Sequence, residues 1–276
     1  MKRLIMCAAA SAVCFVCLAQ TGFKERYDRQ VRNVGYAGVG VETILDRWQE
    51  AEPDDIYMQE GRINFHFYKG QTTQVLSKEG ARFMGAKPLM SLKDSTGRPV
   101  NFFEETFFDD EQFALCQKEI DKAVAAHPRE LLFRQNKIST LISYEKESPD
   151  LAYSSLSSLI SAFKADPAGW TLLGESIGEE DFRSMVQDYC FAFFNIGSAA
   201  SYECFRNASE IMAKAYPKDL NFQTNLGTYQ LVAAGNPKQA LKLYSKVLKS
   251  DPENEVALKN KSIAERQIAT SKKKKK

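Results

Sequence analysis

The chain has 276 residues, a formal net charge of +2 and 44% hydrophobic residues, which is enough apolar material for one sizeable domain or two small ones. Lys and Arg number 37 against 35 Asp and Glu, so the composition lacks the broad basic surplus typical of nucleic-acid-binding surfaces. We therefore expect no nucleic-acid partner.

The N-terminus has the pattern of a secretory signal peptide. Lys2 and Arg3 precede an apolar run from Leu4 to Leu18, which is shorter than the ~20 residues of a usual membrane span. We expect cleavage between Ala19 and Gln20, export to the periplasm or the exterior, and no transmembrane span in the mature chain. The alternative is that the segment is retained as a lipid or helix anchor.

Five of the nine prolines stand at the ends of apolar helical patterns. Proline stops a helix because it lacks the backbone N–H and clashes with the preceding turn. The residues five and eight positions before each proline are almost all apolar, and those twelve before are mostly small, which puts the three positions on one helical face. A repeated helical unit is therefore predicted. The prolines are Pro53, Pro128, Pro167, Pro217 and Pro252.

The clearest unit is Asn221–Pro252, in which a Leu-Gly pair that ends at Gly227 is followed by Ala240, Tyr244 and the closing proline. This order resembles the tetratricopeptide repeat (TPR). The resemblance implies an all-α fold, a right-handed α-solenoid of TPR-like helical hairpins with a small hairpin-like insertion. Elsewhere the repeats are degenerate, so we expect an exported or periplasmic TPR-like protein with one clear repeat.

We expect the signal peptide over residues 1–19, one repeat domain over 20–270 with insertions near 69–109 and 168–180, and a basic, disordered tail over 271–276. The last helix should be a polar cap on the stack. The predicted helices cover Gly22–Arg32, Tyr36–Glu52, Asp55–Tyr68, Asp110–Ala126, Arg129–Glu147, Asp150–Ala165, Glu180–Gly197, Ala199–Ala215, Leu220–Ala234, Pro237–Lys249 and Asn254–Ala269.

The first insertion, Lys69–Asp109, breaks the helical rhythm. Its second half predicts two extended segments around a turn at Asp94–Gly97. Four phenylalanines crowd its exit, and they either pack against the helices or form an aromatic patch for a partner. They are Phe102, Phe103, Phe107 and Phe108.

Nothing in the sequence selects a catalytic, cofactor or metal site. His66 and His127 are the only histidines, and neither stands at metal-ligand spacing from a second ligand. Gly35–Gly40 misses the dinucleotide-binding pattern and predicts a loop or close packing. Acidic runs before helices favour the positive end of the helix dipole. We expect no enzyme activity, no cofactor and no metal.

Three cysteines remain in the mature chain, and two interpretations stay open. Cys190 and Cys204 could pair in an oxidising compartment, which would leave Cys116 single. Alternatively, all three are buried free thiols that act as small apolar residues.

The resemblance also predicts a binding face. TPR-like arrays bind partner segments along a concave face built by the first helix of each unit. These positions hold no lysine or arginine, so the carboxylate clamp of the family's chaperone-tail variant is not expected. The alternative is ordinary solvated surface. The positions are Tyr57, Glu60 and Asn64; Leu132, Gln135 and Ser139; and Asn221, Thr224 and Thr228.

The leading functional hypothesis is an exported scaffold or adaptor that binds a protein or peptide on this face. The alternative is an accessory protein that binds carbohydrate or the cell envelope through the aromatic insertion. The lysine run Lys272–Lys276 is either a solvated tail or a weak contact for an anionic surface.

Overall fold

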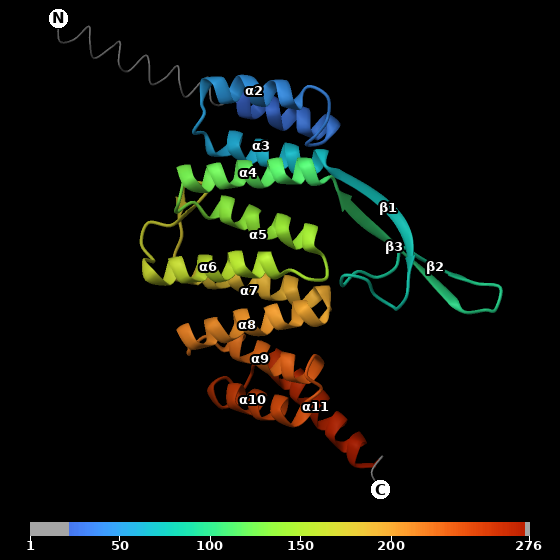
Figure 1. The fold of residues 1–276 in the computed structure, drawn as a ribbon. Coiled ribbons are helices and arrows are strands. Elements are labelled where there is room, and N and C mark those ends of the chain that lie inside the picture. The colour runs from blue at the N-terminus through green and yellow to red at the C-terminus, as the bar shows by residue number, and fades with distance from the viewer. Residues whose placement is uncertain (1–21, 274–276) are drawn as a thin grey trace, which may run out of the picture. The chain divides into compact units, whose positions relative to one another are not determined.

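The computed structural model describes residues 22–273, and this part of the chain is mostly helical (Figure 1). The proposed signal peptide with its cut and the last three lysines lie outside the described residues. The helices are residues 22–34, α2 (Val41–Ala51), α3 (Ile56–Lys69), α4 (Asp110–Ala126), α5 (Leu131–Glu145), α6 (Asp150–Ala165), α7 (Glu179–Ile196), α8 (Ala199–Ala215), α9 (Leu220–Val232), α10 (Pro237–Ser250) and α11 (Glu255–Lys273). The strands are β1 (Gln71–Lys78), β2 (Met90–Lys93), β3 (Pro99–Phe108), β4 (Thr171–Leu172) and β5 (Glu175–Ser176).

The chain divides into two compact units. Unit 1 comprises residues 22–76 together with Glu104–Thr140 and Thr171–Glu175. Unit 2 comprises Ser77–Phe103, Leu141–Trp170 and residues 176–273.

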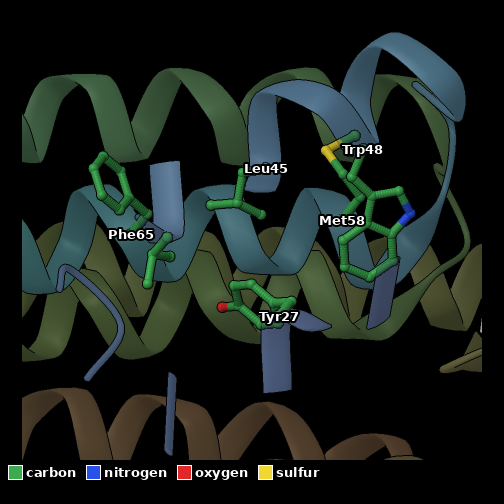
Figure 2. Packing of buried hydrophobic residues seen from close by; sticks show 6 residues of the cluster. Tyr27, Leu45, Trp48, Met58 and Phe65 are labelled. Carbon is green, nitrogen blue, oxygen red and sulfur yellow. The ribbon is translucent and has the colours of Figure 1, made fainter. Parts of the chain in front are cut away.

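Unit 1 has two adjoining apolar clusters. The first joins the helix over residues 22–34 to α2 and α3, and Figure 2 shows five of its members, Tyr27, Leu45, Trp48, Met58 and Phe65. The second lies where α3 packs on α4 and the start of α5, and its buried members are Ile63, Cys116, Ile120, Ala123, Leu132 and Phe133. Each cluster contains three residues that the counting back from the prolines had placed on one helical face. They are Val41, Leu45 and Trp48 in the first cluster and Cys116, Ile120 and Ala123 in the second.

The five prolines end their helices in the same way. Each of α2, α4, α6, α8 and α10 stops two residues before its proline, and the residue between donates its backbone N–H to the carbonyl five positions before the proline. The positions eight before the prolines are all buried, including the polar Ser209. The sequence rule is therefore confirmed at the level of local structure. These accepting residues are Trp48, Ala123, Ala162, Met212 and Val247.

Four of the following helices also begin at a common offset. Three residues after Pro53, Pro128, Pro217 and Pro252 come the first residues of α3, α5, α9 and α11. The side-chain oxygen of the residue before each helix accepts a hydrogen bond from a backbone N–H in the first turn, which is how a helix cap acts. The four capping residues are Asp55, Glu130, Asp219 and Asn254.

In unit 2, α9 and α10 pack as an antiparallel pair at the clearest repeat. Gly227 permits their approach, because a Cβ added there would lie 2.5 Å from Cε1 of Tyr244. Ala240, Tyr244 and Val247 of α10 are fully buried and form a core with Ala257 of α11. Three residues of the quoted pattern, Gly227, Ala240 and Tyr244, therefore lie buried in this helix pair.

The first insertion is a three-stranded sheet in the order β1-β3-β2. β2 and β3 form the predicted hairpin around Asp94–Gly97, with Met90 opposite Phe102 and Lys93 opposite Pro99. β1 was not predicted. The chain leaves α3 and returns to α4 at one point, where the Asp109 N–H donates to the Gly70 carbonyl at 2.7 Å (Figure 1).

The phenylalanines at the exit of this sheet mostly pack inward. Phe103 is buried against Phe83 at 5.9 Å between ring centres, and Phe108 contacts Phe67 and Phe113 at 5.3 and 5.9 Å. Phe107 stays exposed. Packing therefore accounts for Phe103 and Phe108.

The second insertion folds back onto the start of α5 within unit 1. The buried carboxylate of Glu130 caps α5 and also accepts hydrogen bonds from the Thr171 hydroxyl at 2.8 Å and from the Leu173 and Gly174 N–H groups at 2.8 and 3.1 Å. The predicted loop therefore holds the short pair β4 and β5 and is tied to the helix by one carboxylate.

Two further sequence expectations have clear outcomes. The helix predicted to begin at Tyr36 begins at Val41 instead, because Gly40 before it has φ +84°. Cys116, Cys190 and Cys204 are free and buried, which agrees with the interpretation as apolar thiols and not with the Cys190–Cys204 disulfide.

Candidate functional site

A recess with a volume of about 650 Å³ lies in unit 2. It is formed by α7, α8, α9 and α11, and most of its surface is apolar. We call it the amide groove, because six of its lining residues are Asn or Gln. Its lining comprises Gln187, Phe191, Phe194, Phe205, Asn221, Thr224, Asn225, Thr228, Leu231, Val232, Asn254, Glu255, Val256, Asn260, Ile263 and Gln267.

A buried amide pair holds the floor of the amide groove. Asn225 of α9 donates to Gln187 of α7 at 2.9 Å and accepts from it at 3.1 Å, so the two side chains are matched in both directions. Asn225 also donates to the hydroxyl of Ser209 on α8 at 3.2 Å. Because a satisfied buried network fixes side-chain positions, this pair sets the spacing of three helices under the groove.

Thr224 and Thr228 contribute less to the surface than their sequence positions suggested. Their hydroxyls donate to the carbonyls of Leu220 and Thr224, at 2.8 and 3.1 Å, so neither proton is left for a ligand. Tyr244 and Asn260 donate to the Thr228 hydroxyl from the other side, at 3.2 and 3.4 Å. Both threonines line the amide groove, but they mainly shape it.

Asn221 and Gln267 are the polar side chains of the lining best placed to meet a ligand. Asn221 is exposed in the first turn of α9, and Gln267 is exposed on α11. Neither side-chain amide has a hydrogen-bond partner among the described residues. Each amide can donate and accept, so the two offer complementary contacts to a peptide backbone.

Three exposed apolar side chains also line the amide groove, and we call them its apolar rim. Phe191 of α7, Val232 of α9 and Val256 of α11 are 52%, 49% and 55% exposed, although each is a large hydrophobic side chain. Single exposed apolar residues are ordinary, but here three from different helices surround one recess. The spacing of the prolines gives no signal for these three residues, although the run around Phe191 has more apolar residues than one helix face can bury.

The amide groove carries little charge. Glu255, in the first turn of α11, is the only ionisable residue that the described part of the chain contributes to its lining. A bound segment therefore meets no cation, and an acidic segment would be repelled by Glu255.

The other predicted binding residues fall in unit 1. Tyr57, Glu60 and Asn64 lie on α3 and line a second, smaller pocket together with the helix over residues 22–34. Leu132 of α5 is buried, Gln135 is half-buried and Ser139 is exposed, and none of the three lines either recess.

The two histidines have ordinary surroundings. His66 Nδ1 lies 3.2 Å from Oε1 of Gln112, and the His127 ring is 5.7 Å from that of Phe133. Over residues 22–273 no cluster of three His, Cys, Asp or Glu side chains is arranged to hold a metal ion. Within the same range, no helix is both long enough and apolar enough to cross a bilayer.

No protein-family model matches the chain, and no curated protein matches it.

Proposed function

We propose that this chain is an exported TPR-like repeat protein that acts as a scaffold or adaptor by binding an extended peptide segment of a partner in the amide groove. The observation that carries the proposal is the apolar rim of Phe191, Val232 and Val256 around a recess with polar amides. Such a combination of apolar pockets and a few placed polar groups is typical of ligand sites.

The repeat assignment is supported by local structure. Five helices end identically before a proline, four helices begin at one offset after it, and Gly227 allows the approach of Tyr244. We infer from this regularity that the hairpins belong to a degenerate right-handed α-solenoid, with α11 as its polar cap.

An extended segment fits the amide groove better than a helix does. Asn221 and Gln267 can pair with backbone N–H and C=O groups, which an extended peptide presents and a helix has already satisfied internally. The exposed rim residues would hold apolar side chains of that segment. Because Glu255 is the only charge of the lining, the segment should be neutral or basic.

Export and partner class are further parts of the proposal. Export rests on the N-terminal residues Lys2–Leu18, which have the basic and apolar pattern of a signal peptide. A protein partner rests on the lack of a recognisable catalytic motif in the sequence. The partner would then be a protein of the cell envelope or the exterior.

The proposal is tested by selecting displayed peptides on the folded mature chain and measuring the enriched peptides by fluorescence anisotropy. We expect sequences with spaced apolar residues and no acidic run. Phe191→Glu should weaken their binding by about tenfold or more, which corresponds to about 1.4 kcal/mol. Asn221→Ala should weaken it by a smaller factor, because it removes one polar contact.

Leu151→Glu is the matched control, because Leu151 is an exposed apolar residue of α6 outside the amide groove. It should leave binding unchanged, and all variants should melt at the same temperature as the parent. If the enriched peptides bind the Phe191→Glu variant as tightly as they bind the parent protein, the assignment of the binding site to the amide groove is wrong. A photo-crosslinking amino acid at Val232 then identifies the cellular partner, with Val39 as the exposed control position.

A further inference from the structure

Unit 1 contains a second recess, which we call the tyrosine pocket. It lies between the helix over residues 22–34 and α3 and has a volume of about 280 Å³. Tyr27, Tyr36 and Tyr57 line it, together with Glu60 and Asn64. Its size is near the lower end for small-molecule sites and suits one ring-sized ligand.

The hydroxyl of Tyr27 is buried in this region and has no hydrogen-bond partner among residues 22–273. The residue is 7% exposed, and its ring packs on Trp48 at 6.1 Å between centres. Figure 2 shows the hydroxyl oxygen at the end of the ring away from Trp48. Burying a hydroxyl without a partner costs free energy, so a polar ligand atom that met this group would be stabilising.

The hydroxyl end of the Tyr27 ring faces the tyrosine pocket, because its Cζ would lie 3.0 Å from a Cβ added to Gly61, which lines this pocket. Burial is the main cause that raises the pKa of Tyr27, and the next causes are its electrostatic interactions with Tyr36, Glu60 and Asp28. All three of these residues line the tyrosine pocket.

Glu60 and Asn64 add unused polar groups one helical turn apart on α3. Neither side chain has a hydrogen-bond partner among the described residues, and burial raises the pKa of Glu60 against the opposing effect of Lys24. The carboxylate offers acceptors, and the amide offers both donors and an acceptor. A ligand with several hydroxyl groups can satisfy both.

The charges of the tyrosine pocket cancel. Lys24 pairs with Asp28 at 3.1 Å and places its Nζ 4.6 Å from the centre of the Tyr57 ring. Arg32 and Glu60 complete two cations and two anions in the lining. With this balance a charged ligand gains no net attraction to offset the cost of its desolvation, so a neutral ligand is favoured.

Two tyrosine rings give the tyrosine pocket an apolar wall at its opening. Tyr36 is stacked on Tyr68 at 4.7 Å, and both Tyr36 and Tyr57 are partly exposed. Tyrosine combines an apolar face with a polar tip, which suits a ligand that has C–H faces and hydroxyl edges. A sugar ring has both.

We propose that the tyrosine pocket binds a single neutral sugar ring, free or as one residue of a glycan, with Tyr27, Glu60 and Asn64 as its hydrogen-bonding groups. This site is independent of the amide groove and does not use the aromatic residues of the insertion.

Ligand-observed saturation-transfer NMR on the mature chain tests the proposal. The probes are glucose, galactose, mannose and N-acetylglucosamine, compared with the anion glucuronate and the cation glucosamine. At least one neutral sugar should bind in the millimolar range, and it should bind better than both charged sugars. Equal binding of charged and neutral sugars, or no binding of any neutral sugar, would overturn the proposal.

The variant Tyr27→Phe removes the hydroxyl and keeps the ring. It should lower the affinity for the sugar by about tenfold, which is the effect of one hydrogen bond, and it should not lower the melting temperature of the protein. Tyr202→Phe on α8 is the control and should bind as the parent does. If Tyr27→Phe binds sugar as the parent does, the hydroxyl does not contact the ligand and the site is wrong as proposed.

Discussion

The carboxylate of Glu130 accepts a hydrogen bond from the Thr171 hydroxyl at 2.8 Å, across 41 positions of sequence. The same carboxylate caps α5 through the N–H of Leu132 and holds the N–H groups of Leu173 and Gly174. One buried side chain therefore joins a helix start to an insertion that the repeat pattern does not explain.

Replacement of Glu130 by glutamine should detach this insertion. The amide NH₂ would face backbone donors that the carboxylate now accepts, so we expect a loss of about 1–3 kcal/mol in the free energy of unfolding. Urea unfolding measures the loss, and hydrogen exchange at Leu173 and Gly174 should become faster. Glu50→Gln, on the exposed side of α2, should change neither quantity. Unaltered exchange in Glu130→Gln would show that the carboxylate does not hold the loop.

Gly227→Ala should destabilise unit 2. The added methyl group would lie 2.5 Å from Tyr244, and overpacking of this kind costs about 1–3 kcal/mol. Gly22→Ala is the matched control, because an added Cβ there meets nothing within 4 Å. Thermal unfolding should separate the two variants, with Gly22→Ala equal to the parent or slightly more stable. Similar melting temperatures would mean that α9 and α10 adjust without strain.

The buried thiols predict a loss of stability at alkaline pH. Burial raises the pKa of Cys116, Cys190 and Cys204 to about 12 each, from an ordinary value of 9.0. Between these values the unfolded chain releases thiol protons and the folded chain keeps them, so the free energy of unfolding falls as the pH rises. Below pH 9 the contribution is fully present.

Cys190→Ala should make this pH dependence less steep, because it removes one thiol that ionises only after unfolding. The comparison is made with the parent protein in urea at several pH values from neutral to strongly alkaline, so that tyrosine ionisation affects both proteins alike. A thiol reagent should label none of the three cysteines before unfolding. Rapid labelling of the native protein would contradict the burial argument. So would an equal dependence of the free energy of unfolding on pH in Cys190→Ala and the parent.

Asp219 should show two separable effects. Its Oδ1 caps α9 through the N–H of Asn221 at 3.1 Å, and its Oδ2 accepts from Arg183 of α7 at 2.8 Å. Asp219→Asn keeps an N-cap residue and loses the ion pair, whereas Asp219→Ala loses both. We expect Asp219→Ala to cost about 1 kcal/mol more in urea unfolding, the typical effect of a cap. If both variants lose the same free energy of unfolding, the Asp219 side chain does not stabilise α9 as a cap.

The helix ends could be predicted because their cause is local. A proline with an apolar face before it determines where a helix stops, and the observed bounds of α4, α6 and α8 coincide with the predicted ones. The predicted start of α2 was wrong because the positive φ of Gly40 depends on the turn and not on helical periodicity. β1 was missed because its pairing with β3 links distant segments.

The site could be predicted only in part. Counting from Pro217 led to Asn221, Thr224 and Thr228, which all line the amide groove. The exposed rim residues Phe191 and Val256 come from other helices, so no offset within one repeat could reveal them. The hydrogen bonds from the two threonine hydroxyls to carbonyls of their own helix also could not be predicted from the residue pattern.

The hydrogen bond between Gly70 and Asp109 has a consequence for the history and engineering of the chain. Because the insertion departs and returns at neighbouring backbone groups, its two ends already meet as closely as the ends of a tight turn. The core that α3 and α4 share through Ile63 and Ile120 lies outside it. At this junction the segment between Gly70 and Asp109 could therefore be exchanged with the shared core left in place, and a reporter domain with adjacent termini could be grafted there.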